Sequence, residues 1–201
     1  MGKVKIIGVT GPIGSGKSTV SGILHDEWKA KVIDADQIAR EVVRKGEKAL
    51  SEMVDYFGPE ILDEKGELIR SKLAEMVFGN EEKVKVLNAI THKHIMERLL
   101  NRLEQAKSES WPEGVIVVDV PLPVKHGFLD TVDEVWVVYA DPETRIGRVM
   151  ERSGLSRQEV IARMNSQMSD EEYLKLADKV ILNNGSKEKL KEQIIRLMRS
   201  G

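Results

Sequence analysis

Apolar residues follow two alternating patterns along the chain, one typical of buried strands and the other of amphipathic helices. Short, almost wholly apolar runs are typical of strands in a parallel sheet, and they occur at residues 6–9, 31–33, 115–120, 135–139 and 179–182. Between these runs, apolar residues recur at helical spacing, which predicts helices over 18–28, 37–43, 142–151 and 156–164, and from 186 onward. This alternation predicts an α/β fold with a central parallel sheet flanked by helices.

The middle of the chain departs from the alternation. From about residue 47 the β-branched runs disappear, and helical periodicity continues to about residue 107. The pattern predicts helices over 71–78 and 81–107, with apolar side chains of the longer one on a single row. We therefore expect a helical insertion over residues 58–108, within a core formed by residues 1–57 and 109–201.

The first strand leads into a glycine-rich turn and a helix start, which together form a phosphate-binding loop. The spacing G-x-x-x-x-G-K-[ST] is met by Gly11, Gly16, Lys17 and Ser18, and the motif has the required strand before it. Glycines allow successive N–H groups to turn inward around an anion, and the helix adds its positive end. We expect a nucleoside triphosphate here, cradled by Gly11, Pro12, Ile13, Gly14, Ser15, Gly16, Lys17, Ser18 and Thr19. The alternative is a structural turn that happens to contain a lysine.

Three aspartates follow predicted strands. Asp34 and Asp36 lie where the second strand gives way to a helix, and Asp119 ends the run 115–118. Carboxyl ends of parallel strands are where ligands bind in such sheets. Asp36 is a candidate base for an acceptor hydroxyl, and Asp119, with the Ser18 hydroxyl, is a candidate magnesium ligand. Helix or strand capping remains the alternative for each aspartate.

Five arginines lie on two consecutive predicted helices of a segment expected to be a lid, about residues 145–168: Arg145, Arg148, Arg152, Arg157 and Arg163. Guanidinium groups neutralise charge on a γ-phosphate during transfer, and they typically come from a mobile lid. A solvated helix face is the alternative.

Composition narrows the function classes. The chain has 201 residues, 41% of them apolar, which suits one domain with an insertion. A net charge of −2 gives no basic field for nucleic acid. There is no cysteine, and thiolate chemistry is excluded. We expect neither a signal peptide nor a membrane span, and a cytoplasmic location.

Several motifs together resemble one family, the dephospho-coenzyme A kinases. They are Gly11-Pro-Ile-Gly-Ser-Gly-Lys-Ser-Thr19, Ile33-Asp-Ala-Asp-Gln-Ile-Ala-Arg40, Asp119-Val-Pro-Leu122 and Ala177-Asp-Lys-Val-Ile-Leu-Asn183. The resemblance covers essentially the whole chain. It implies a P-loop nucleotide-kinase fold and transfer of the ATP γ-phosphate to the ribose 3′-hydroxyl of dephospho-coenzyme A, the last step of coenzyme A synthesis.

The resemblance also implies roles for individual residues. Asp36 matches the base, Arg148 and Arg152 match lid arginines, and Asn183 matches a position near the adenine. The helical insertion would hold the acceptor, with contacts from Asp36, Arg40, Arg70, His92 and Pro121. Magnesium would be the cofactor, and the chain would be a monomer or a weak homo-oligomer. Departures from the family pattern are Pro12, Lys93, Arg145 and the segment 121–125.

Two other functions would also use the phosphate loop. A kinase for another small hydroxyl or a nucleotide acceptor would have the same loop, lid and insertion. An ATP-dependent switch protein would use the loop to order a partner surface. The guanine-reading sequence Asn-Lys-x-Asp does not occur in the chain.

Overall fold

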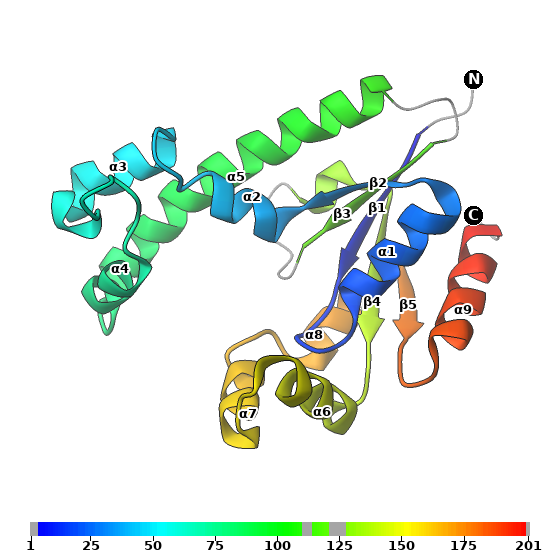
Figure 1. The fold of residues 1–201 in the computed structure, drawn as a ribbon. Helices are drawn as coiled ribbons and strands as arrows, with labels where there is room; N and C mark the ends of the chain where they lie inside the picture. The colour runs from blue at the N-terminus through cyan, green and yellow to red at the C-terminus, as the bar shows by residue number, and fades with distance from the viewer. Residues whose placement is uncertain (1–3, 110–113, 121–127, 200–201) are drawn as a thin grey trace. The chain divides into compact units, whose positions relative to one another are not determined.

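The computed structural model describes residues 4–109, 114–120 and 128–199, and they form two compact units. The first unit contains residues 1–34 and 105–201, and the second contains residues 35–104. The first unit is built on a five-stranded parallel sheet with the order β2-β3-β1-β4-β5 (Figure 1). The strands are β1 (Lys5–Thr10), β2 (Lys31–Asp34), β3 (Val115–Asp119), β4 (Glu134–Tyr139) and β5 (Lys179–Leu182).

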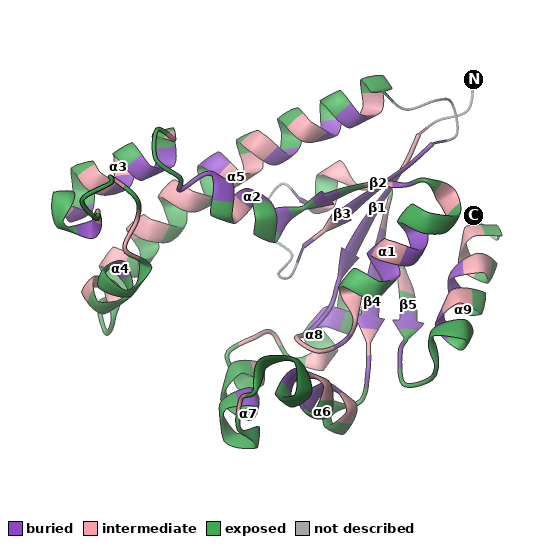
Figure 2. Ribbon diagram, viewed as in Figure 1, coloured by how far each residue is buried: buried purple, intermediate pink, exposed green. Residues whose placement is uncertain are grey.

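Two helices cover one face of this sheet. Helix α1 (Lys17–Trp28) follows the phosphate loop, and α9 (Lys187–Arg199) ends the described chain. Both pack their apolar side chains against the central strands, in a cluster that includes Val20, Leu24 and Ile194 with Trp136 of β4. The three central strands, β3, β1 and β4, are almost wholly buried, whereas the edge strands β2 and β5 each have two exposed residues (Figure 2). Burial on both faces explains why the sequences of the central strands are continuous apolar runs and not alternating ones.

Three helices occupy the segment between β4 and β5. They are α6 (Pro142–Ser153), α7 (Arg157–Asn165) and α8 (Asp170–Lys175). A capping box formed by Ser156 and Glu159 starts α7. A second capping box, formed by Ser169 and Glu172, starts α8, a short helix that periodicity did not predict.

The second unit is helical. Its elements are α2 (Ala35–Glu41), α3 (Lys48–Phe57), α4 (Arg70–Val77) and most of α5 (Glu81–Glu109), with a 3-10 turn at Pro59–Ile61. Ion pairs tie the early helices to α5: Glu41 to Arg102, Glu47 to Arg98, and Glu52 to Lys93. A hydrogen bond also joins Glu52 to His94. The unit therefore starts before the expected insertion boundary at residue 58, since contacts remote in sequence group α2 and α3 with α5.

A helix that crosses a membrane must be both long and predominantly apolar. Within the described residues, no helix is both long and apolar enough to cross a bilayer.

Candidate active site

The phosphate loop has the backbone geometry that its sequence predicts. Gly11, Gly14 and Gly16 have positive φ angles of 148°, 78° and 93°. A Cβ atom on Gly16 would lie 2.2 Å from the Asn183 amide nitrogen, and one on Gly11 would lie 2.2 Å from the Val138 carbonyl oxygen. Two of these glycines are therefore required both by dihedral angle and by space.

The loop runs into α1 without a side-chain cap. Gly16 is the N-cap residue and makes no side-chain hydrogen bond, so the first N–H groups of the helix depend on other acceptors. The Lys17 ammonium group lies across the loop and donates to the Gly11 carbonyl oxygen at 3.0 Å. The Ser15 hydroxyl is buried without a hydrogen-bond partner among the described residues. A helix start with these donors is a site for an anion.

The aspartates at the edge of the sheet follow the strand register. Asp119 pairs in register with Asp34 on one side and with Val9 on the other. The Ser21 hydroxyl of α1 donates to Asp119 Oδ2 at 2.9 Å and fixes the carboxylate. Ser21 was not predicted as a site residue. Its position one helical turn after Lys17 is the sequence signal that could have found it.

Asp36 belongs to the second unit. It is exposed and lies in the first turn of α2, which begins directly after β2. Only Ala35 separates Asp36 from Asp34, the last residue of β2.

A pocket of about 210 Å³ opens beside the phosphate loop. Its lining residues come from the loop, α1, α6, the turn after β5 and the start of α9: Gly16, Thr19, Arg148, Asn183, Gly185, Lys187 and Leu190. The buried Asn183 amide donates to the Ser15 carbonyl oxygen at 2.8 Å. Asn183 thus braces the loop and also lines the pocket.

The five arginines of the expected lid divide into different environments. Arg145 is 3% exposed. Its guanidinium group contacts both Asp170 carboxylate oxygens, at 2.6 and 2.8 Å, and lies over the Tyr139 ring. Arg157 forms a surface ion pair with Glu143. Both of these guanidinium groups are thus paired with carboxylates, so the five arginines do not share one environment.

The other three arginines remain candidates for phosphate contact. Arg148 lines the pocket beside the loop, and its Nη1 is buried without a partner among the described residues. Arg152 and Arg163 are exposed on α6 and α7. Arg148 therefore has its guanidinium group at the pocket beside the phosphate loop, where a bound phosphate could contact it.

Burial around Arg145 also affects a tyrosine. Tyr173 of α8 is fully buried, and this burial raises its pKa to about 12. Its hydroxyl stays protonated across the physiological range, so Tyr173 acts as a packing residue in this unit.

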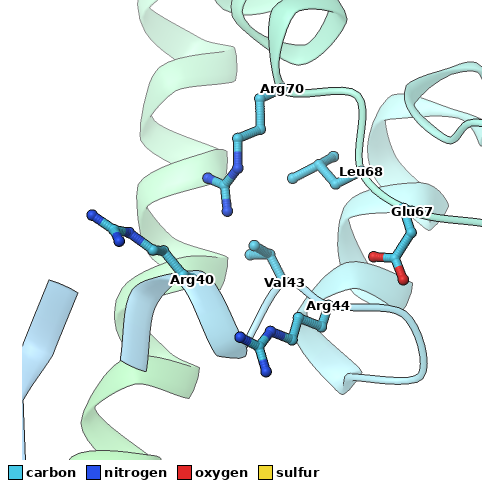
Figure 3. A pocket seen from close by; sticks show the side chains of 6 residues that line it. All are labelled: Arg40, Val43, Arg44, Glu67, Leu68 and Arg70. Atoms are coloured by element: carbon cyan, nitrogen blue, oxygen red, sulfur yellow. The ribbon is translucent and has the colours of Figure 1, made fainter. Parts of the chain in front are cut away.

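The second unit contains a pocket of about 430 Å³ with three arginines (Figure 3). The arginine pocket is lined by Arg40, Val43, Arg44, Glu67, Leu68 and Arg70. Among the described residues, none of its three guanidinium groups forms a hydrogen bond or ion pair. The structure thus brings the predicted residues Arg40 and Arg70 together and adds Arg44, which lies in the turn after α2.

The other two predicted acceptor contacts are His92 and Pro121. His92 is exposed on α5 and does not line the arginine pocket. Its neighbour His94 is buried, and His94 Nε2 lies 3.0 Å from Glu52 Oε1. Pro121 lies outside the described residues.

Known proteins resemble the chain over nearly its whole length. The dephospho-CoA kinase family matches residues 5–189. A dephospho-CoA kinase of Carboxydothermus hydrogenoformans is 45% identical over 195 residues, 96% of this chain and 92% of that protein. A crystal structure from Thermus thermophilus matches with a TM-score of 0.80 and 35% identity over 98% of both chains. The dephospho-CoA kinase of Campylobacter jejuni matches with a TM-score of 0.70 and 29% identity, over 96% of this chain and 95% of that one.

Proposed function

Because this chain belongs to the dephospho-CoA kinase family, we propose that its first unit binds ATP at the phosphate loop and its second unit binds the acceptor at the arginine pocket. The enzyme phosphorylates dephospho-CoA, and we assign the ribose 3′-hydroxyl as the acceptor group. The observation that carries this division is that each candidate site lies wholly within one unit.

The phosphate loop supplies the ATP site. The backbone from Gly11 to Thr19 surrounds the phosphates, and Lys17 leaves the Gly11 carbonyl oxygen to contact the β- and γ-phosphates. Thr19, Arg148 and Asn183 extend the site into the pocket beside the loop, where the rest of the nucleotide is held. The buried, unpartnered Arg148 Nη1 has the charge and the position to contact phosphate.

Magnesium fits the oxygen groups at the edge of the sheet. The exposed Ser18 hydroxyl and the Asp119 carboxylate are the hard donors that Mg²⁺ prefers. Ser18 would hold the ion directly, and Asp119, fixed by Ser21, would hold it directly or through water. When bound, the ion neutralises charge on the phosphate oxygens.

The arginine pocket suits the diphosphate of the acceptor. Dephospho-CoA carries two linked phosphates between its adenosine and its pantetheine arm. Arg40, Arg44 and Arg70 form no ion pair or hydrogen bond among the described residues, although Glu67 also lines the pocket and Glu41 interacts electrostatically with Arg44. Guanidinium groups bind phosphate through paired hydrogen bonds. Val43 and Leu68 give the pocket an apolar wall.

Asp36 is the proposed base. A carboxylate beside the acceptor orients its hydroxyl and takes its proton as the oxygen attacks the γ-phosphate. The support is its exposure and its place two residues after Asp34 of β2. Arg152 is proposed to join Arg148 in stabilising the transferred group, and His92 and Pro121 to contact the acceptor. We also propose a cytoplasmic location and a monomeric or weakly associating chain.

The division predicts separate effects on the two substrates. Arg40→Ala and Arg70→Ala should each raise the KM for dephospho-CoA about tenfold or more, because each removes a charged hydrogen-bond donor. The KM for ATP should stay within about twofold. Arg196→Ala, an exposed change of the same charge on α9, is the control. If these substitutions raised only the KM for ATP, the arginine pocket would bind ATP and not dephospho-CoA, and the proposed division would be wrong.

A further inference from the structure

The phosphate loop is attached to the arginine-bearing helices at Ile13. The Ile13 side chain packs against the apolar cluster of Ile146, Val149 and Val160, which joins α6 to α7. Its backbone N–H donates to the side-chain oxygen of Gln167 at 2.8 Å. Gln167 lies between α7 and α8, 154 residues further along the chain. One loop residue is thus held by both its side chain and its backbone.

Among the described residues, the Ile13 N–H is a backbone donor that links this part of the loop to the segment between α7 and α8. Pro12 has no N–H to donate. Gly14 lies against the Arg145 backbone, where a Cβ atom would come within 2.8 Å of the carbonyl oxygen. The first half of the loop therefore follows α6 closely, and its orientation depends on what accepts the Ile13 N–H.

Gln167 is itself held in place. Its backbone N–H donates to the Met164 carbonyl oxygen at the end of α7. Three residues later, Asp170 binds the buried Arg145 of α6. The Gln167 backbone is thus anchored next to α7 and lies three residues from the Asp170 ion pair, and its side-chain oxygen accepts from the Ile13 N–H.

We infer that Gln167 is a positioning residue, which holds the phosphate loop through the Ile13 N–H and joins the loop to α6 and α7 as one body. The inference rests on the proposed binding of ATP at this loop. Gln167 orders the loop before ATP arrives, so that a larger fraction of the protein is competent to bind. It also keeps Arg148 in register with the loop, because α6 and the loop share the same anchor.

The test replaces the acceptor oxygen and keeps the size of the side chain. Gln167→Met removes the acceptor, Gln167→Glu retains one, and Gln105→Met repeats the change at an exposed position of α5. Amide hydrogen exchange at Ile13, measured by NMR, should speed up at least tenfold in Gln167→Met and stay near the wild-type rate in Gln167→Glu and Gln105→Met. This readout does not require turnover.

Calorimetric titration with Mg-ATP gives the second readout. Gln167→Met should weaken ATP binding about tenfold and leave the KM for dephospho-CoA unchanged. Unchanged Ile13 exchange in Gln167→Met would overturn the inference. So would tighter ATP binding, since Gln167 would then compete with phosphate for the N–H. The affinity of the wild-type protein for ATP tests the proposed function separately, because the inference concerns only the difference between variants.

Discussion

The phosphate loop is built from backbone groups, whereas the arginine pocket is built from side chains. In the loop, glycine dihedral angles and two close backbone approaches leave almost no freedom. In the pocket, Arg40, Arg44 and Arg70 are exposed and unpaired among the described residues. Side-chain substitutions can remove the charged groups of the pocket one at a time, whereas they leave the backbone N–H groups of the loop in place.

The largest effect is expected at the loop. Lys17→Ala should lower kcat about a thousandfold, because it removes the charge that stabilises the γ-phosphate in the transition state. ADP release with saturating substrates measures it. Lys175→Ala, on the exposed face of α8, should leave the rate unchanged. Activity within tenfold of wild type in Lys17→Ala would contradict the assigned role.

A smaller loss is expected from the proposed base. Asp36→Asn should lower kcat about a hundredfold while the affinity for ATP stays nearly constant, since the amide cannot take the proton. Single-turnover kinetics separate transfer from binding. Asp55→Asn, an exposed change in the same unit, is the control. A near-normal rate in Asp36→Asn would exclude Asp36 as the base.

The next largest effect distinguishes two kinds of arginine on α6 and α7, one beside the phosphate loop and one in a surface ion pair. Arg148→Ala should lower kcat about tenfold, with a smaller change in the KM for ATP, because its charge acts mainly on the transition state. Arg157→Ala is the matched control, since this guanidinium is already paired with Glu143. Equal losses from both variants would mean that the helix surface as a whole matters, and not the place of Arg148 beside the loop.

The smallest effect concerns the stability of the second unit. The hydrogen bond from Arg102 lowers the pKa of Glu41 below 4.5. A lowered carboxyl pKa stabilises the fold above its ordinary value, and this contribution is lost as pH falls through the lowered value. Arg102→Ala should cost about 1–2 kcal/mol near neutral pH, and the cost should shrink as the pH falls below the ordinary carboxyl pKa and through the lowered one. Urea unfolding at several pH values measures it, and a cost that does not depend on pH would contradict this cause.

The sequence predicted the loop well because its determinants are local. Strand, glycines, lysine and helix start occupy one continuous stretch, and their spacing dictates the geometry. The order of the strands' apolar runs likewise predicted the parallel sheet, which the structure confirms. Helix α8 was missed, although its capping box at Ser169 and Glu172 was visible in the sequence, because its six residues are too few to show periodicity.

The rest depended on contacts that no local pattern specifies. Ser21 meets Asp119 across 98 residues, and Gln167 meets Ile13 across 154. The extent of the second unit depends on pairs such as Glu41 with Arg102, 61 residues apart. Arg145 was grouped with the lid because its helix is rich in arginine, yet Asp170 and Tyr139 bury it. Charge pattern alone does not tell a buried arginine from a phosphate-binding one.

Acceptor-dependent release of ADP tests the central claim most directly. The purified chain would be given ATP and magnesium with dephospho-CoA, AMP, adenosine or no acceptor, in parallel coupled assays. We expect rapid ADP release with dephospho-CoA. With AMP, adenosine or no acceptor, we expect ADP release little above background. Equal turnover with AMP, or ATP hydrolysis that needs no acceptor, would contradict this account.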